Sequence, residues 1–266
     1  MLTCTGHVRV QFLLEWLDLA LRWAHVFAGI LWVGTTYYFT WVGRRLGEEG
    51  AGVSIVHGGA FYTVRKQTDP PEQLHWFRWE ALTTWLTGLA LLWIVYYLRG
   101  RGAGVSGLGR PATFAVAIGV LLFAWIVYDL LWLSPLARFE TPLVALCYLI
   151  LVALSYGLMQ VFNGRAAYIH VGALMGTLMT ANVWLRIVPA YRRIREAVRA
   201  GRPLDEALVA RAQLRSKHNA FLAMPTVLTM ISNHYPASTY GSQHAWLVLA
   251  VLILVGWAAA KVIRDH

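Results

Sequence analysis

The sequence contains few charged residues and few cysteines. Only 14% of its 266 residues are charged and 58% are hydrophobic, a combination that water-soluble domains of this length rarely show. The two cysteines, Cys4 and Cys147, lie far apart and belong to no CxxC or CxxCH string. The sequence therefore supports neither a disulfide scaffold, nor a thiolate zinc site, nor a covalently attached c-type haem.

Acidic residues are also scarce, and the formal net charge is +10. A nucleic-acid-binding protein would gather its basic residues on one recognition element. Here the basic residues fall instead in the connectors between apolar runs. We therefore expect no nucleic-acid partner and attribute the positive charge to membrane topology.

Long apolar runs dominate what is present. Each is close to the roughly 20 residues that a helix needs to cross a bilayer. The runs cover 23–43, 79–98, 112–134, 142–162, 168–190, 217–233 and 244–262. The sequence predicts an all-α, polytopic transmembrane helix bundle of about seven spans, forming a single domain over residues 1–266 in a lipid bilayer.

The distribution of Lys and Arg predicts the orientation of these spans, because basic residues concentrate on the cytoplasmic side. With seven spans, sixteen Lys and Arg residues fall on one side, most of them in the connectors 44–78 and 191–216. The other side has only Arg9, Arg99, Arg101, Arg110 and Arg165. We predict that the N-terminus lies outside.

Histidines at helix ends are the first candidates for chemistry, because an imidazole inside a membrane is costly unless it is paired or ligated. His25 and His170 open two spans that run in the same direction, in the similar strings HVFA and HVGA. Two histidines at matching depth can clamp one haem iron. We predict an outer haem b on His25 and His170; the alternative is a hydrogen bond from each imidazole to a backbone carbonyl.

Further histidines lie at the ends of other spans. His218 opens the sixth span on the inner face, His234 closes it on the outer face, and His75 directly precedes the second span. Histidines at two depths suggest two haems, the inner one using His218 with His75. The sequence leaves open whether there is one haem b or two, and His234 is a further candidate ligand.

Polar residues on the inner face are the candidates for catalysis. His57, Glu80 and Asp129 are expected to lie near His75 and His218, and buried carboxylates beside imidazoles are expensive without a purpose. Gly58 and Gly59 follow His57 and would permit either close approach to a flat ligand or a plain turn. The predicted catalytic residues are His57, Glu80 and Asp129, and the predicted substrate-binding residues are Arg78, Arg186 and Asn182.

Several long strings carry a resemblance to a known family. They are RWAHVFAGILWVGTTYYF, HGGAFYTVRK, LHWFRWEALTTWLTG, QVFNGRAAYIHVGALMGTLMTANVW and SKHNAFLAMPTVLTMISNHYP. Together they resemble the N-terminal membrane domain of the bacterial membrane-bound urate hydroxylases, the urate oxidase N-terminal domain, over almost the whole chain. The pattern of His25, Trp32 and Gly34 is also similar to helices of other small haem-b membrane proteins.

The resemblance implies a multi-pass protein of the bacterial cytoplasmic membrane that hydroxylates urate with water. In that family the electrons pass to a cytochrome c domain fused after one more helix. This sequence reaches His266 without a CxxCH motif, so a separate cytochrome c or a quinone is the expected acceptor. Because urate is an anion, a guanidinium is its expected partner, and Arg78 and Arg186 are the nearest on the inner face.

Two other classes compete with this interpretation. A haem-b subunit could anchor a soluble dehydrogenase and link it to the quinone pool, without oxidising a substrate of its own. A transporter or channel would need charged residues facing a midplane cavity, and the midplane of these spans is nearly uncharged. The electron-transfer subunit is therefore the stronger alternative.

Overall fold

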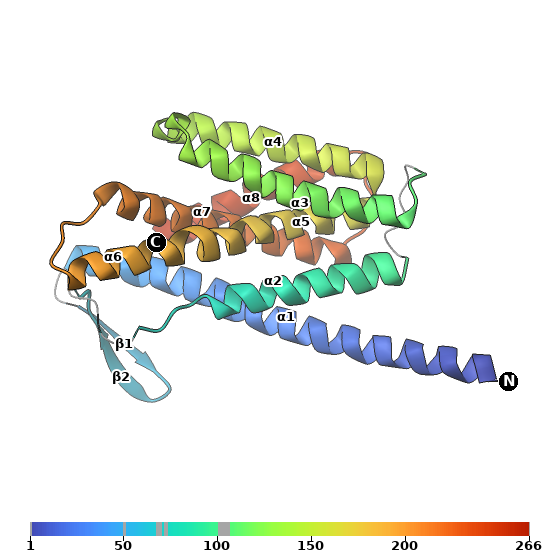
Figure 1. Cartoon of the computed structure of the whole chain (residues 1–266), viewed down its shortest axis with the longest axis horizontal. Coiled ribbons are helices and arrows are strands. Elements are labelled where there is room, and N and C mark those ends of the chain that lie inside the picture. The colour runs from blue at the N-terminus through green and yellow to red at the C-terminus, as the bar shows by residue number, and fades with distance from the viewer. Residues whose placement is uncertain (1, 50–51, 68–70, 72–73, 101–106, 266) are drawn as a thin grey trace.

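The computed structural model describes residues 2–49, 52–67, 71, 74–100 and 107–265, with the side chains of residues 10–47 in the first helix. Helices form most of the molecule and run roughly alongside one another (Figure 1). In a bilayer every backbone N–H and C=O must be paired within the protein, and a helix achieves this within one segment. The predicted all-α bundle is confirmed.

The helical elements lie as follows along the chain: α1 (Leu2–Glu49), α2 (Trp79–Leu92), η1 (Trp93–Leu98), α3 (Arg110–Leu133), η2 (Pro135–Arg138), α4 (Glu140–Val161), α5 (Gly164–Ala181), η3 (Asn182–Ile187), α6 (Val188–Arg199), α7 (Glu206–Ile231), η4 (Ser232–His234) and α8 (Ala245–Asp265). Two of them, η1 and η3, are π-helical segments that continue α2 and α5. Such segments interrupt the regular hydrogen-bond ladder and are frequent at functional sites.

Among the described residues, six helical segments are long and apolar enough to cross a membrane. They are Val10–Gly47, Trp79–Leu98, Arg110–Leu133, Glu140–Val161, Gly164–Arg199 and Ala245–Asp265. The chain is therefore a membrane protein. The remaining predicted span, 217–233, falls in α7, which has sufficient length but carries Arg215 and Lys217 within it. The count of seven spans and the outside N-terminus stay predictions.

The connector 44–78 contains a β-hairpin that the sequence analysis did not predict. Strand β1 (Val53–His57) pairs antiparallel with β2 (Ala60–Val64), with His57 opposite Ala60. Gly58 and Gly59 close it with φ values of 59° and 79°, the two left-handed residues that a tight two-residue hairpin turn requires. No atom lies within 4 Å of a Cβ built on either glycine, so the pair forms a plain turn.

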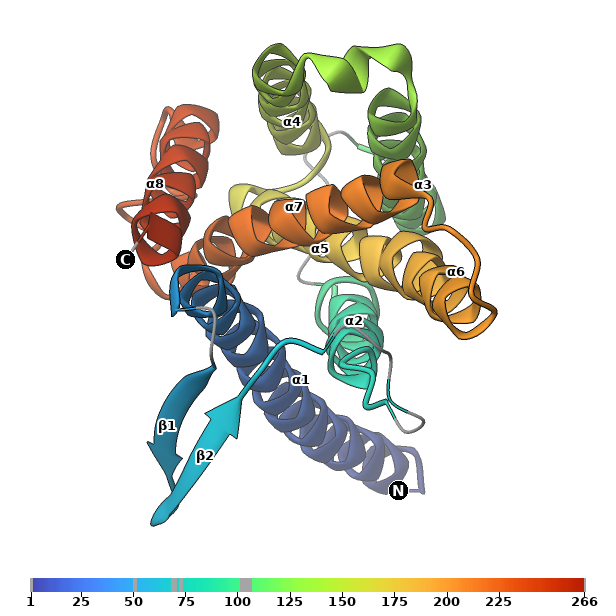
Figure 2. The ribbon, with the colours of Figure 1, turned by 90° about the vertical axis from the view of Figure 1, so that its left-hand side faces the viewer.

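Helix α5 occupies the centre of the bundle and contacts α2, α3, α4 and α7 (Figure 2). Helix α2 packs between α1 and α5, and α8 packs on α7. Most of the side chains of α5 are buried, including Tyr168, Met175 and His170. We call the end of the bundle near the hairpin and α6 the hairpin end, and the opposite end the N-terminal end (Figure 1).

Candidate functional site

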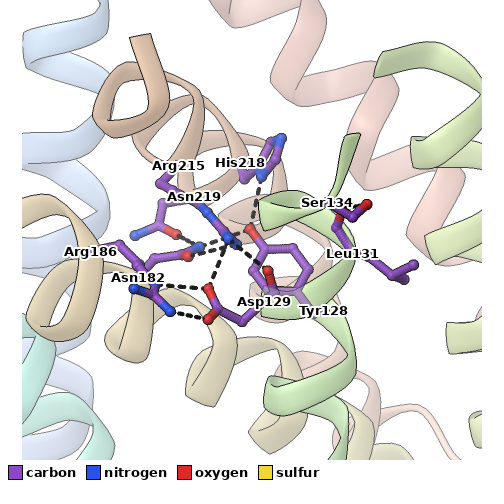
Figure 3. A network of polar contacts seen from close by, with 9 residues as sticks. All are labelled: Tyr128, Asp129, Leu131, Ser134, Asn182, Arg186, Arg215, His218 and Asn219. Carbon is purple, nitrogen blue, oxygen red and sulfur yellow. Dashed lines mark hydrogen bonds and ion pairs between the residues drawn. The ribbon is translucent and has the colours of Figure 1, made fainter. Parts of the chain in front are cut away.

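Polar side chains from α3, η3 and α7 meet at the hairpin end of the bundle (Figure 3). Asp129 is at their centre. Its Oδ1 accepts hydrogen bonds from Arg186 Nε at 2.9 Å and from Arg215 Nη2 at 2.8 Å, and its Oδ2 is ion-paired with Arg186 Nη2. The side chain of Arg215 is only 4% exposed and that of Arg186 is 38% exposed. Arg215 therefore forms the buried side of the cluster and Arg186 its accessible side.

This cluster carries more positive than negative charge. Two guanidinium groups share the single carboxylate of Asp129 and, within the part of the chain that the structure describes, neither meets a second carboxylate. An excess charge held among apolar helices is costly, and a bound anion offsets that cost. The cluster is therefore suited to an anionic ligand.

A chain of amides leads from the cluster into the bundle. Asn219 Nδ2 donates to the carbonyl of Met179 at 2.9 Å, and Asn219 Oδ1 accepts from Asn182 Nδ2 at 2.9 Å. Asn182 Nδ2 also donates to the hydroxyl oxygen of Tyr128 at 3.0 Å, and its Oδ1 accepts from Arg215 Nη1 at 3.4 Å. Asn182 begins the π-helical segment η3, and Met179 lies just before it. The irregular ladder there leaves the Met179 carbonyl available to a side chain.

The amide chain favours one tautomer of His218. Because the oxygen of Tyr128 accepts from Asn182, its hydroxyl hydrogen is directed to His218 Nδ1, 2.8 Å away. In a neutral imidazole with an accepting Nδ1, the ring proton is on Nε2. Nε2 is buried and has no hydrogen-bond partner among the described residues. His218 thus offers an unused N–H donor.

A cavity of about 440 Å³ adjoins His218. It lies between α3, α4, α7 and α8, and two leucines of α5 also contribute to it. Most of the lining is aliphatic or aromatic, and the Trp132 ring lies 4.2 Å from that of His218. The charged lining residues are Glu140, Lys217 and Lys261, of which Lys217 is ion-paired with Glu140. The cavity is therefore mostly apolar, and three of its lining residues, His218, Trp132 and Trp257, carry a buried ring N–H without a hydrogen-bond partner among the described residues.

The structure brings together four of the predicted site residues. Asp129, Asn182 and Arg186 form the cluster, and His218 joins it through Tyr128. The predicted role of Asp129 as a base is not favoured by this arrangement, because both of its oxygens already pair with guanidinium groups. Its evident role is to hold the two arginines in place.

His57 and His75 lie away from the cluster. His57 is the last residue of β1 and is exposed, and the exposed His75 contacts the edge of Phe77 with ring centroids 4.6 Å apart. The structure therefore does not bring either histidine together with Asp129 and His218, as the sequence had led us to expect. For His57 the reason is that residues 53–64 fold as a separate hairpin.

Arg78 and Glu80 lie at the start of α2, also outside the cluster. The Arg78 guanidinium stacks on Trp79 and Trp184, 5.2 and 5.1 Å from the ring centroids. Among the described residues, Arg78 Nε and Glu80 Oε2 are buried without hydrogen-bond partners. Their turn of α2 is nevertheless adjacent to η3, because Thr180 donates to the carbonyl of Ala81 at 3.4 Å.

His25 has the hydrogen-bonding arrangement of a metal ligand. Its Nδ1 lies 2.8 Å from the carbonyl oxygen of Thr84 on α2. A carbonyl can only accept, so Nδ1 carries the proton and Nε2 retains its lone pair, as in metal-bound imidazoles. Gly88 makes room for the ring, since a Cβ at this position would lie 2.9 Å from His25 Cε1. His25 therefore fits an axial haem ligand.

His170 lacks that freedom. Its Nδ1 donates to the carbonyl of Ala166 at 2.7 Å, its Nε2 accepts from the Tyr97 hydroxyl at 2.8 Å, and Phe162 stacks on the ring at 4.3 Å. Both ring nitrogens therefore have hydrogen-bond partners. One of them is a backbone carbonyl, which was the alternative to haem ligation in the sequence analysis. This residue does not fit a haem ligand.

The structure does not bring His25 and His170 together either. His25 contacts α2 at Gly88, whereas His170 contacts its continuation at Tyr97, about nine residues or roughly 13 Å further along the axis. The two rings therefore lie at different depths. His234 ends η4 at the far end of α7 from His218, and its role as a ligand stays a prediction. No group of three or more His, Cys, Asp or Glu suited to a metal ion occurs in the described residues.

Arg215, Asn219 and Tyr128 belong to the site but were not predicted from the sequence. A signal for two of them exists, because Arg215 and Asn219 are one helical turn apart, as are Asn182 and Arg186, and so share a face. Two such polar pairs, one of them inside the apolar run 168–190, point to facing partners. Tyr128 has no comparable signal, since tyrosines also occur at membrane interfaces.

Comparisons with known proteins complete the description of this site. The family model described as "Urate oxidase N-terminal" matches residues 11–265. No curated protein and no solved structure matches the chain. The matched range covers nearly the whole chain. It therefore includes every residue of the cluster and of the cavity. The chain belongs to the urate oxidase N-terminal family.

Proposed function

We propose that this protein is an oxidoreductase of the bacterial cytoplasmic membrane that hydroxylates urate, or a closely related anion, and passes the electrons to a cytochrome c or a quinone. Family membership supports the reaction type. The observation that carries the proposal is the cluster at the hairpin end, where Arg186 and Arg215 share one carboxylate. Its excess positive charge suits an anion, and its amides suit the edge of a purine.

Arg186 is the proposed contact with the substrate. It uses Nε and Nη2 on Asp129 and leaves Nη1 without a hydrogen bond in the described structure. A guanidinium edge presents planar, directional donors that match the oxygens of a planar anion. Asn182, which is fully buried and bonded to Arg215, orients the inner side of the cluster.

Glu80 is the best of the three predicted bases for activating water. Its Oε2 is buried and accepts no hydrogen bond among the described residues, whereas Asp129 is committed to arginines and His57 is exposed on the hairpin. Residues on both sides of Asn182 bond to this turn of α2: Thr180 to Ala81, and Trp184 Nε1 to the Arg78 carbonyl at 3.2 Å. A carboxylate with free lone pairs next to an anion-binding cluster can accept a proton from water.

Haem b is the proposed prosthetic group, with His25 as its ligand. The free lone pair on His25 Nε2 supports this assignment, and Gly88 leaves the room that the His25 ring occupies. When bound, haem b supplies one-electron transfer. His25, held by the Thr84 carbonyl, fixes the ring orientation that such a ligand needs.

The cavity beside His218 favours a second candidate function. An apolar cavity in a membrane bundle is also what an electron-transfer subunit would use to reduce quinone on behalf of a soluble dehydrogenase. That protein would need no anion-binding cluster. The two candidates therefore differ in whether urate itself is the electron donor.

The test is urate consumption by the purified protein with ferricyanide as a soluble electron acceptor. Urate should disappear and ferricyanide should be reduced with no other protein added. Arg186→Gln should raise KM by about tenfold to a hundredfold, because a charge-assisted hydrogen bond contributes roughly 1.5–3 kcal/mol. Arg211→Gln, which removes an exposed charge from α7, is the matched control and should have little effect. A haem-replete protein that ignores urate but is reduced by a quinol would favour the electron-transfer subunit.

A further inference from the structure

We infer that the cavity between α3, α4, α7 and α8 binds the head group of a quinone, and that His218 Nε2–H donates a hydrogen bond to one of its carbonyl oxygens. The inference deepens the proposed function, on which it rests for the source of electrons, by naming the acceptor and its site. It begins from the direction of the hydrogen bonds that end at His218.

The direction of that chain is determined at its first member. The carbonyl of Met179 can only accept, so Asn219 must present its NH₂ group there and its oxygen to Asn182. Asn182 in turn presents its NH₂ group to both Asn219 and Tyr128. The Tyr128 hydroxyl therefore donates to His218 Nδ1, and the chain ends in an N–H on Nε2.

An imidazole N–H excludes some ligands and favours others. A haem iron needs the lone pair that this nitrogen does not offer in the observed network. A buried donor without an acceptor is unfavourable, and a ligand in the adjoining cavity whose acceptor atom reaches Nε2 would remove that cost. A carbonyl oxygen on an apolar ring satisfies both the N–H and the hydrophobic lining.

The remainder of the cavity suits the body of a quinone. Its volume of about 440 Å³ lies within the range of pockets that bury a small organic ligand. Trp132 and Trp257 contribute flat apolar surfaces, and Leu174 and Leu178 close the side toward α5. A lipid acyl chain would fill the same apolar space but would leave His218 Nε2–H without an acceptor.

The charged residues of the cavity provide a route for protons. Lys217 is the neighbour of His218 in sequence and is ion-paired with Glu140, and their side chains are 39% and 43% exposed. Reduction of a quinone to a quinol takes up two electrons and two protons. Hydroxylation of urate by water replaces one hydrogen by a hydroxyl group and releases two electrons and two protons. Urate, water and quinone thus give hydroxylated urate and quinol in balance.

The experiment is a binding titration of the detergent-purified protein with a decyl-substituted benzoquinone, read by quenching of tryptophan fluorescence and carried out without urate. His218→Leu should weaken binding about fivefold or more, because the hydrogen bond to the carbonyl is lost. His218→Gln retains a side-chain N–H donor and should bind within about threefold of the unchanged protein. His244→Leu, an exposed histidine outside the cavity, is the control and should bind normally.

Three results would overturn the inference. His218→Leu could bind the quinone as tightly as the unchanged protein, or decanol could displace it as well as the quinone itself does, which would indicate a lipid site. Loss of haem b from His218→Leu with retention in His244→Leu would make His218 a haem ligand. Urate oxidation is measured separately with ferricyanide, so quinone binding that depends on His218 in a protein that ignores urate would contradict only the proposed function.

Discussion

Two Tyr–His pairs, one at each end of the bundle, look alike and differ in one hydrogen bond. At the N-terminal end the Tyr97 hydroxyl contacts His170 Nε2, and at the hairpin end the Tyr128 hydroxyl contacts His218 Nδ1, both at 2.8 Å. His170 uses its other nitrogen on the carbonyl of Ala166, whereas the other nitrogen of His218 has no partner in the described structure. Both ring nitrogens of His170 therefore have hydrogen-bond partners, whereas only one ring nitrogen of His218 has a partner among the described residues.

The surroundings of the two histidines also differ: His170 is packed among aromatic rings, whereas His218 lines a cavity. Phe162 stacks on His170, and Tyr96 and Tyr97 also approach it edge-on. His218 lines a cavity and is linked through Tyr128 to a cluster with excess positive charge. The comparison teaches that a buried histidine indicates a site only when one nitrogen remains unused, since a fully bonded one is explained by packing.

The largest effect should come from His25, a third histidine that also leaves one nitrogen free. His25→Ala should remove essentially all haem b, because the histidine that offers an Nε2 lone pair at the α1–α2 contact in the described structure is lost. His170→Ala should retain haem b, since neither of its nitrogens is free. A pyridine haemochrome assay on the purified variants measures this. Equal haem loss in both variants would show that the comparison of free nitrogens fails.

A smaller effect should follow from changing the charge of Asp129, beside the Tyr128–His218 pair at the hairpin end. Asp129→Asn leaves two guanidinium groups without their carboxylate, and should lower the free energy of unfolding by about 3–5 kcal/mol. Glu140→Gln is the matched control, because its ion pair with Lys217 is half-exposed and surface pairs contribute only about 0–1 kcal/mol. Thermal unfolding in detergent measures both. Similar losses in the two variants would contradict the assignment of Asp129 as the buried centre of the cluster.

The smallest of these effects should come from Tyr97→Phe in the Tyr97–His170 pair at the N-terminal end. It leaves His170 Nε2 buried without a donor, which should cost roughly 1–3 kcal/mol of stability. Urate oxidation with ferricyanide and quinone binding should both be unchanged, because Tyr97 belongs to neither site. Unfolding measurements together with the two assays check this. A selective loss of either activity in a stable variant would assign a functional role to the Tyr97–His170 pair.

Part of the candidate site could be predicted from the sequence, because polar residues in apolar helices are conspicuous. Asp129, Asn182 and Arg186 were identified in this way and do lie together. The partners of His25, His170 and His75 could not be predicted, because spacing along a helix gives depth and face but not which neighbouring helix is contacted. His57 was misplaced because the hairpin turn at Gly58–Gly59 carries the chain away from the bundle.

The sequence by itself determined that the chain is helical and belongs in a membrane, since apolar runs of this length leave the backbone no other way to pair its polar groups. Only the tertiary structure decided which histidine retains a free lone pair, which retains a free N–H and which has neither. That outcome depends on the direction of hydrogen bonds between helices distant in sequence, from Met179 through Asn219, Asn182 and Tyr128 to His218. These bonds exist only when α3, α5 with its continuation η3, and α7 pack together.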